Sequence, residues 1–125
     1  MEKIRSHKDL NVYQLAFDSA LQIHQISQSF PAEEKYALTD QIRRCSRSVC
    51  ANMAEAWRKR KYKNHFISKL SDSEAEAAET QVWLDFALAF QYIDNKTHED
   101  LMDRYEHIIA MLINMSHSPD NWIIK

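Results

Sequence analysis

Residues 38–57 read LTDQIRRCSRSVCANMAEAW, and the spacing of their apolar side chains decides the fold class. Leu38, Ile42, Cys45, Val49 and Met53 recur at intervals of three and four residues, which places them on one face of an α-helix. Polar and charged residues fill most of the positions between them. The stretch therefore predicts an amphipathic helix that buries one stripe against other helices.

The same spacing recurs in three other stretches, and short breaks separate them. We expect helices over residues 11–29, 33–59, 64–93 and 98–116, followed by an apolar tail over 118–125. Pro31 ends the first helix, the basic run 58–64 separates the second from the third, and Pro119 ends the fourth. Thr97, with Asp100 three residues later, approximates a capping box at the start of the fourth. The sequence therefore predicts a single all-α domain, an antiparallel up-down-up-down four-helix bundle.

Composition excludes several classes of protein. The 125 residues contain no glycine, whereas phosphate-binding loops, dinucleotide fingerprints and the serine-hydrolase elbow all require it. The formal net charge is only −2, there is no run of 18 apolar residues, and the N-terminus is polar. We therefore expect a cytoplasmic protein without a membrane partner, in which Cys45 and Cys50 are reduced thiols.

Charge is segregated along the chain despite the small net value. Residues 41–63 hold eight cations and one acid, whereas residues 64–95 hold six acids and one lysine. Either the charges of two antiparallel helices offset each other across the surface, or part of the basic run holds phosphate. The candidate nucleic-acid-binding residues are Arg43, Arg44, Arg47, Arg58, Lys59, Arg60, Lys61 and Lys63.

Aromatic residues interleave with this basic run. Trp57, Tyr62 and Phe66 lie within or beside it, a combination typical of surfaces that bind single-stranded nucleic acid. Trp57 and Phe66 also fall on the expected core stripes, so packing is the alternative role for both.

No pattern of catalytic or metal-binding residues stands out. A di-iron bundle needs Glu-x-x-His pairs, and no glutamate here has a histidine three residues later. Asp103 and His107 share a helix face and are expected to form a surface ion pair, while Cys45 occupies a core position. We therefore expect no metal, no cofactor and no enzymatic activity.

The stretch 82–90 is apolar on more sides than a lone bundle can bury. Such a surface indicates burial by neighbouring molecules, so a homo-oligomer is expected. The candidate interface residues are Trp83, Phe86 and Phe90.

A set of short elements at fixed spacing, between Lys8 and His117, carries a resemblance to a known family. The elements are Asp9-Leu10 with Val12-Tyr13, then Phe30-Pro31 with Glu34, Tyr36 and Leu38, then Gln41-Ile42-Arg43-Arg44-Cys45 with Ser48-Val49 and Asn52-Met53-Ala54-Glu55, and finally Phe66, Leu70, Glu79-Thr80-Gln81 and Leu84. In these elements the chain resembles the bacterial four-helix-bundle proteins named for intervening sequences of 23S ribosomal RNA genes.

The resemblance implies an antiparallel four-helix bundle that assembles into a homopentameric ring. The accessory proteins of diversity-generating retroelements are similar in shape and are thought to bind nucleic acid. This chain departs from the family where relatives have glycine, because Ala37, Ala56 and Gln91 stand at those positions. We expect the two alanines to let the second helix run with fewer interruptions, so that the basic run sets its end.

Two functional hypotheses follow. The first is a non-enzymatic, oligomeric bundle that binds RNA or DNA through the basic residues of the second helix and the loop after it. The second is a scaffold or adaptor that binds a protein and has no nucleic-acid role. Asn52 and Glu55 serve either an interface or a ligand under both hypotheses.

Overall fold

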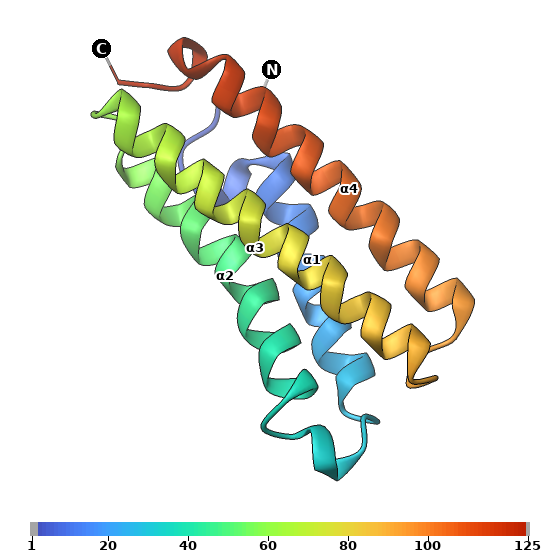
Figure 1. The fold of residues 1–125 in the computed structure, drawn as a ribbon. Helices are drawn as coiled ribbons and strands as arrows, with labels where there is room; N and C mark the ends of the chain where they lie inside the picture. Colours follow the sequence, from blue (N-terminus) through green and yellow to red (C-terminus); the bar gives the residue numbers. More distant parts are fainter. Residues whose placement is uncertain (1–2, 125) are drawn as a thin grey trace.

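Four long helices make up the protein, in a computed structural model that describes residues 3–124. They are α1 (Asn11–Ser27), α2 (Leu38–Arg58), α3 (Lys63–Ala89) and α4 (Asn95–His117). Three short 3-10 turns, η1 (His7–Asp9), η2 (Ala32–Glu34) and η3 (Pro119–Asn121), precede α1, precede α2 and follow α4. Successive helices run in opposite directions (Figure 1). The predicted all-α, up-down-up-down bundle is confirmed.

The apolar stripes meet along the bundle axis. Each helix packs against its two neighbours, α4 closes back on α1, and within residues 3–124 the backbones of the diagonal pair α1 and α3 do not approach closely. The side chains at the centre come from all four helices and are fully buried, among them Ile23, Ile42, Phe66, Leu84 and Ile108. Burying each such side chain contributes about 1.5–3 kcal/mol, which makes the stripes the main source of stability.

The α1–α2 connection differs from the prediction because residues 32–34 form a turn of their own. The α2 helix begins at Leu38 rather than at residue 33, and the carboxylate of Glu34 accepts the Leu38 N–H at 3.3 Å. Glu34 thus satisfies one of the free donors that every helix start presents. Ala37 lies outside α2 and does not extend it, whereas the helix runs without a break through Ala56.

The end of α3 lies four residues before the expected position. Gln91 has a φ of 64°, and no other non-glycine residue in the described part of the chain has a positive φ. The Gln91 N–H donates to Leu88 and the Tyr92 N–H donates to Ala87, at 2.9 and 2.8 Å. This pair of bonds is the Schellman motif, which ends a helix with a left-handed residue. Gln91 is one of the positions where the resemblance implies glycine.

The start of α4 corrects the expected cap. Asp94 is the N-cap, and its carboxylate accepts the Thr97 N–H at 2.8 Å. The same bond lowers the pKa of Asp94. The interpretation of Thr97 as the cap was wrong because the helix begins at Asn95, two residues earlier.

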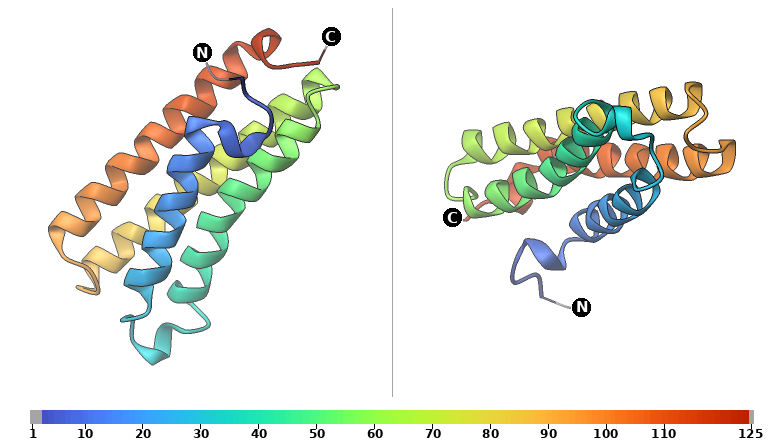
Figure 2. Two further views of the ribbon diagram at one scale, coloured as in Figure 1. Left: turned by 180° about the vertical axis from the view of Figure 1, so that it is seen from behind. Right: turned by 90° about the horizontal axis from the view of Figure 1, so that it is seen from below.

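Both described ends of the chain lie at the same end of the bundle as the α2–α3 turn, while η2 and the α3–α4 loop lie at the other (Figure 2). The C-terminal tail docks there, because the Ile124 N–H donates to the Arg60 carbonyl at 3.0 Å. Trp122 and Ile123 are half-buried against the core.

Candidate nucleic-acid interface

The three candidate arginines within α2 each have a partner inside the molecule. Arg43 donates from Nε to the Ser27 hydroxyl at 2.8 Å and from Nη2 to the His24 carbonyl at 3.5 Å, at the end of α1. Arg44 pairs with Asp40 on its own helix at 3.0 Å. Arg47 lies 3.3 Å from the Nδ1 of His24. These contacts tie α2 to α1 and to itself, and none of them involves the acids of α3.

Two cations, Arg60 in the α2–α3 turn and Lys63 at the start of α3, hold the C-terminal tail. Arg60 donates to the Trp57 carbonyl at 2.8 Å and to the Trp122 carbonyl at 3.5 Å, and its guanidinium stacks 3.5 Å from the centre of the Trp57 ring. Lys63 pairs with Asp120 at 3.4 Å. Arg60 therefore links the turn to the tail through its hydrogen bond to Trp122, and its cation–π contact with Trp57 holds the guanidinium against α2.

The remaining three cations are exposed. Within residues 3–124, the side chains of Arg58, Lys59 and Lys61 form neither an ion pair nor a hydrogen bond. They follow one another at the end of α2 and in the turn after it. Of the eight candidate residues, these three have side chains without a partner among the described residues, whereas the other five each bond to another group of the protein.

The N-terminal segment brings more positive charge to the same place, which the sequence reasoning missed. His7 of η1 lines a shallow hollow of about 350 Å³ together with Arg58 and Lys59, and Arg5 and Lys8 are exposed beside it in the chain. The signal was present in the basic residues before α1, but only the packing of η1 on α2 places them next to the turn. We call Arg5, Lys8, Arg58, Lys59 and Lys61 the basic end.

The described acids near the basic end are engaged with other groups. The carboxylate of Asp9 accepts the backbone N–H groups of Arg5 and Ser6, which lowers its pKa. Glu55 pairs with Lys69 of α3 at 2.7 Å, and this bond lowers the pKa of Glu55. It is the ion pair between α2 and α3 in the described part of the chain, and it joins an acid of α2 to the single lysine of the acidic segment 64–95. The alternative in which the acids of α3 offset the cations of α2 has no ion pair among the described contacts.

One aromatic side chain remains available for stacking. Tyr62 is 58 % exposed, directly after Lys61, whereas Trp57 and Phe66 are buried as the packing alternative predicted. An exposed ring among cations is the combination that stacks a base while the charges hold phosphate.

A second feature of the surface is apolar. On α3, Val82, Phe86 and Phe90 are each about half exposed and follow Glu79 along one stripe, while Trp83 is half-buried against the core. Between α1 and α2 lies a groove of about 570 Å³, where Phe17 and Leu21 are about half exposed beside Arg47. The sequence pointed to the α3 stripe and missed the α1–α2 groove, because Phe17 and Leu21 lie off the core stripe of α1.

The reactive side chains of the core are protonated. Burial raises the pKa of Cys45 to about 12 and that of Cys50 to about 11, and the Thr80 hydroxyl donates to the Cys45 Sγ at 3.1 Å. Both thiols are free, as predicted. The His107 Nδ1 lies 3.8 Å from the Asp103 carboxylate, the expected surface partner, and 2.9 Å from the Asp103 backbone carbonyl. Asn52 donates to the Ser48 carbonyl of its own helix.

The described residues have neither a metal-binding cluster nor a membrane-spanning helix. No cluster of three or more His, Cys, Asp or Glu side chains suited to a metal ion occurs between residues 3 and 124. None of the helices in that range combines the length and the apolar character that a membrane crossing requires.

Comparisons with known proteins agree with the fold. A crystal structure of a protein of unknown function from the S23 ribosomal protein family of Bacteroides thetaiotaomicron is similar, with a TM-score of 0.77 and 27 % sequence identity. The match covers 86 % of this chain and 96 % of that one. No curated protein matches the chain. The model of the family described as 23S rRNA-intervening sequence protein matches residues 8–114. The chain therefore belongs to the 23S rRNA-intervening sequence protein family.

Proposed function

We propose that this protein is a non-enzymatic, oligomeric bundle that binds single-stranded RNA or DNA through its basic end. The observation that carries the proposal is the convergence of five exposed cations from two separate segments on one end of the bundle, with Tyr62 among them. The nearby acids Asp9 and Glu55 keep their charge but are outnumbered by the five cations, so the local field is positive even though the whole chain carries −2. Arg43 and Arg60 serve the fold, Arg44 and Lys63 are paired with acids at the surface, and Arg47 lies in the α1–α2 groove.

The salt dependence of binding tests the proposal. Each phosphate contact with a single strand changes the slope of log affinity against log salt by about −0.7, so five contacts predict a slope of about −3.5. Replacing Arg58, Lys59 and Lys61 with alanine should make that slope shallower by about 2. Replacing Lys96, an exposed lysine at the other end of the bundle, is the matched control and should leave the slope unchanged. Absence of binding to single-stranded probes at low salt would contradict the proposal.

The oligomer, in this proposal, forms by a contact between two different surfaces. The α3 stripe of one copy, with Glu79, Phe86 and Phe90, packs into the α1–α2 groove of the next, which presents Phe17, Leu21 and Arg47. Glu79 and Arg47 give the two apolar surfaces opposite charges. A head-to-tail contact forms a ring when the rotation between successive copies closes, and the family resemblance implies a ring of five. The basic ends would then repeat around the ring and raise the avidity for a long strand.

Light scattering tests the assembly directly. The expected mass is five times the 14.8 kDa of one chain. A 14.8 kDa particle at micromolar concentration would contradict it. The scaffold hypothesis shares the apolar surfaces but makes no use of the basic end. Protein capture that is insensitive to nuclease and unchanged by alanine at Arg58, Lys59 and Lys61 would favour that hypothesis.

A further inference from the structure

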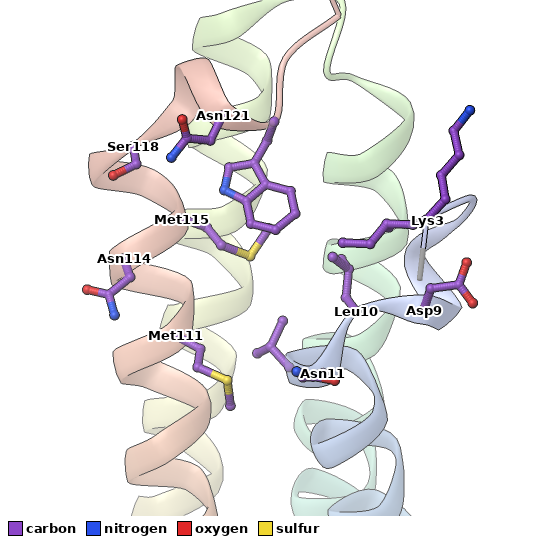
Figure 3. Close-up of a pocket in the computed structure, with 12 residues that line it drawn as sticks. Lys3, Asp9, Leu10, Asn11, Met111, Asn114, Met115, Ser118 and Asn121 are labelled. Carbon is purple, nitrogen blue, oxygen red and sulfur yellow. The ribbon is translucent and has the colours of Figure 1, made fainter. Parts of the chain in front are cut away.

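A groove lies between the start of α1 and the end of α4, apart from both the basic end and the proposed contact between copies. Its volume is about 570 Å³, within the range of small-molecule sites. Its apolar lining comes from Val12 on α1, from Met111 and Met115 on α4 and from Trp122 of the tail. Figure 3 shows the two methionines extending from α4 toward the N-terminal segment.

Side-chain amides add polar groups to this apolar lining. Asn11, Asn114 and Asn121 all line the groove, and none of their carboxamides forms a hydrogen bond with another group in residues 3–124. Each carboxamide offers one acceptor oxygen and two N–H donors. All three asparagines are exposed at the rim, and the carboxamide of Asn114 points outward from α4, away from the indole (Figure 3). The groove thus combines a flat indole and two thioethers with the rim carboxamides of Asn11 and Asn121.

The groove is joined to the basic end through the C-terminal tail. Trp122 lines the groove and its carbonyl accepts from Arg60, which lies between Lys59 and Lys61 in the chain. Lys3 and Asp9 lie on the opposite wall, and their charged ends point outward (Figure 3). Asp9 is the one acid among the lining residues, and it is held by the backbone of Arg5 and Ser6.

We propose that this groove receives one unstacked base of a single-stranded nucleic acid whose phosphates lie on the basic end. The inference rests on the proposed function. A base presents an apolar face, which packs on an aromatic ring, and a polar edge, which needs both donors and acceptors. Carboxamides supply both kinds of group in one side chain, and the neighbouring cations supply the charge that the phosphates require.

The test compares strands with and without bases on the full chain. Fluorescence anisotropy would measure the affinity for a labelled ten-nucleotide rU strand, for the same length of dT, and for a ten-residue abasic strand. We expect the abasic strand to bind about tenfold more weakly than the base-bearing ones. Equal affinity for all three strands would overturn the groove proposal and leave the basic end as the proposed site. Failure of all three to bind at low salt would overturn the proposed function itself.

Variants separate the groove from the exposed Tyr62. Asn11→Ala together with Asn121→Ala should remove most of the preference for base-bearing strands and leave the affinity for the abasic strand unchanged. Asn95→Ala, at the first residue of α4 and at the other end of the bundle, is the matched control and should leave the preference intact. A preference that survives the double substitution and disappears in Tyr62→Ala would assign the stacking to Tyr62 and overturn the groove proposal. Circular dichroism of each variant checks that the helices are retained.

Discussion

The Nε of Arg43 donates a hydrogen bond of 2.8 Å to the hydroxyl of Ser27, sixteen residues earlier in the chain. The Ser27 hydroxyl in turn donates to the His24 carbonyl at 3.0 Å, so the arginine completes the polar network at the end of α1. A cation is favoured at this position because the carbonyl end of a helix carries partial negative charge.

Arg43→Ala should therefore affect stability and not nucleic-acid binding. We expect a loss of about 1–3 kcal/mol in the free energy of unfolding, the usual effect of removing a charged hydrogen-bond partner. Urea denaturation would measure it. The salt slope of strand binding should stay the same as in the unchanged protein. A shallower slope would show that Arg43 contacts phosphate.

Gln91→Gly should stabilise the protein. Gln91 adopts a φ of 64°, which costs a residue with a side chain about 1–2 kcal/mol and costs glycine very little. We expect a gain of about 1 kcal/mol in unfolding free energy. Ala89→Gly, within the last turn of α3, is the control and should lose about 1 kcal/mol, because its helical φ gives glycine no advantage. A destabilised Gln91→Gly variant would contradict the role assigned to this residue.

Tyr105→Phe should be neutral or stabilising. The Tyr105 ring is fully buried and its hydroxyl has no hydrogen-bond partner among the described groups. An unsatisfied buried hydroxyl costs about 1–3 kcal/mol, and phenylalanine retains the packing of the ring. Thermal unfolding followed by circular dichroism would measure the change. Tyr92→Phe is the counterpart, and should be destabilising because the Tyr92 hydroxyl donates to Glu34 at 2.9 Å.

The cysteines should react slowly in the folded protein. The pKa of Cys50 rises from 9.0 to about 11, so at pH 8 about a hundredth of the usual thiolate is present. Alkylation by iodoacetamide, followed by mass spectrometry, should be slower than in urea by at least that factor. Rapid modification of the native protein would mean that the thiols are more accessible than the structure indicates.

The same thiols predict the sign of an alkaline effect on stability. Because folding raises both thiol pKa values above 9.0, their contribution is fully present below pH 9 and is lost as pH rises toward about 12. Denaturation at pH 8 and at pH 10 should therefore give a lower unfolding free energy at pH 10. The difference should shrink in a variant with alanine at Cys45 and Cys50.

A mixing experiment should reveal the head-to-tail contact. Phe17→Asp removes the apolar character of the α1–α2 groove, and Phe86→Asp does the same for the α3 stripe, so each variant alone should be a monomer. An equimolar mixture retains one intact groove and one intact stripe, and should form a heterodimer by light scattering. If the contact instead joined two identical surfaces, only the variant in that surface would be a monomer. The other variant would still assemble on its own.

The sequence alone was enough to predict most of the fold. Stripes such as Leu38, Ile42 and Val49 specify which face of each helix is buried, and this pattern depends only on local spacing. Helix ends were harder to predict, because Asp94 and Gln91 act through individual hydrogen bonds and one backbone angle. The sequence near each helix end allows more than one residue to be the terminal one, and the packing of the helices selects among these positions.

The candidate site depended on tertiary structure for a similar reason. The sequence determined that eight cations cluster in residues 41–63, because charge along the chain is a matter of composition. It did not determine which of them remain available to bind nucleic acid, because that depends on partners distant in the chain. Arg43 donates to Ser27, Arg60 donates to Trp122, and Lys63 pairs with Asp120. Only the folding of the N-terminal segment onto α2 brings His7, which lies between Arg5 and Lys8 in the chain, into one hollow with Arg58. Helical periodicity is local and can be read from the chain, whereas hydrogen bonds and ion pairs between distant residues exist only once the helices have packed.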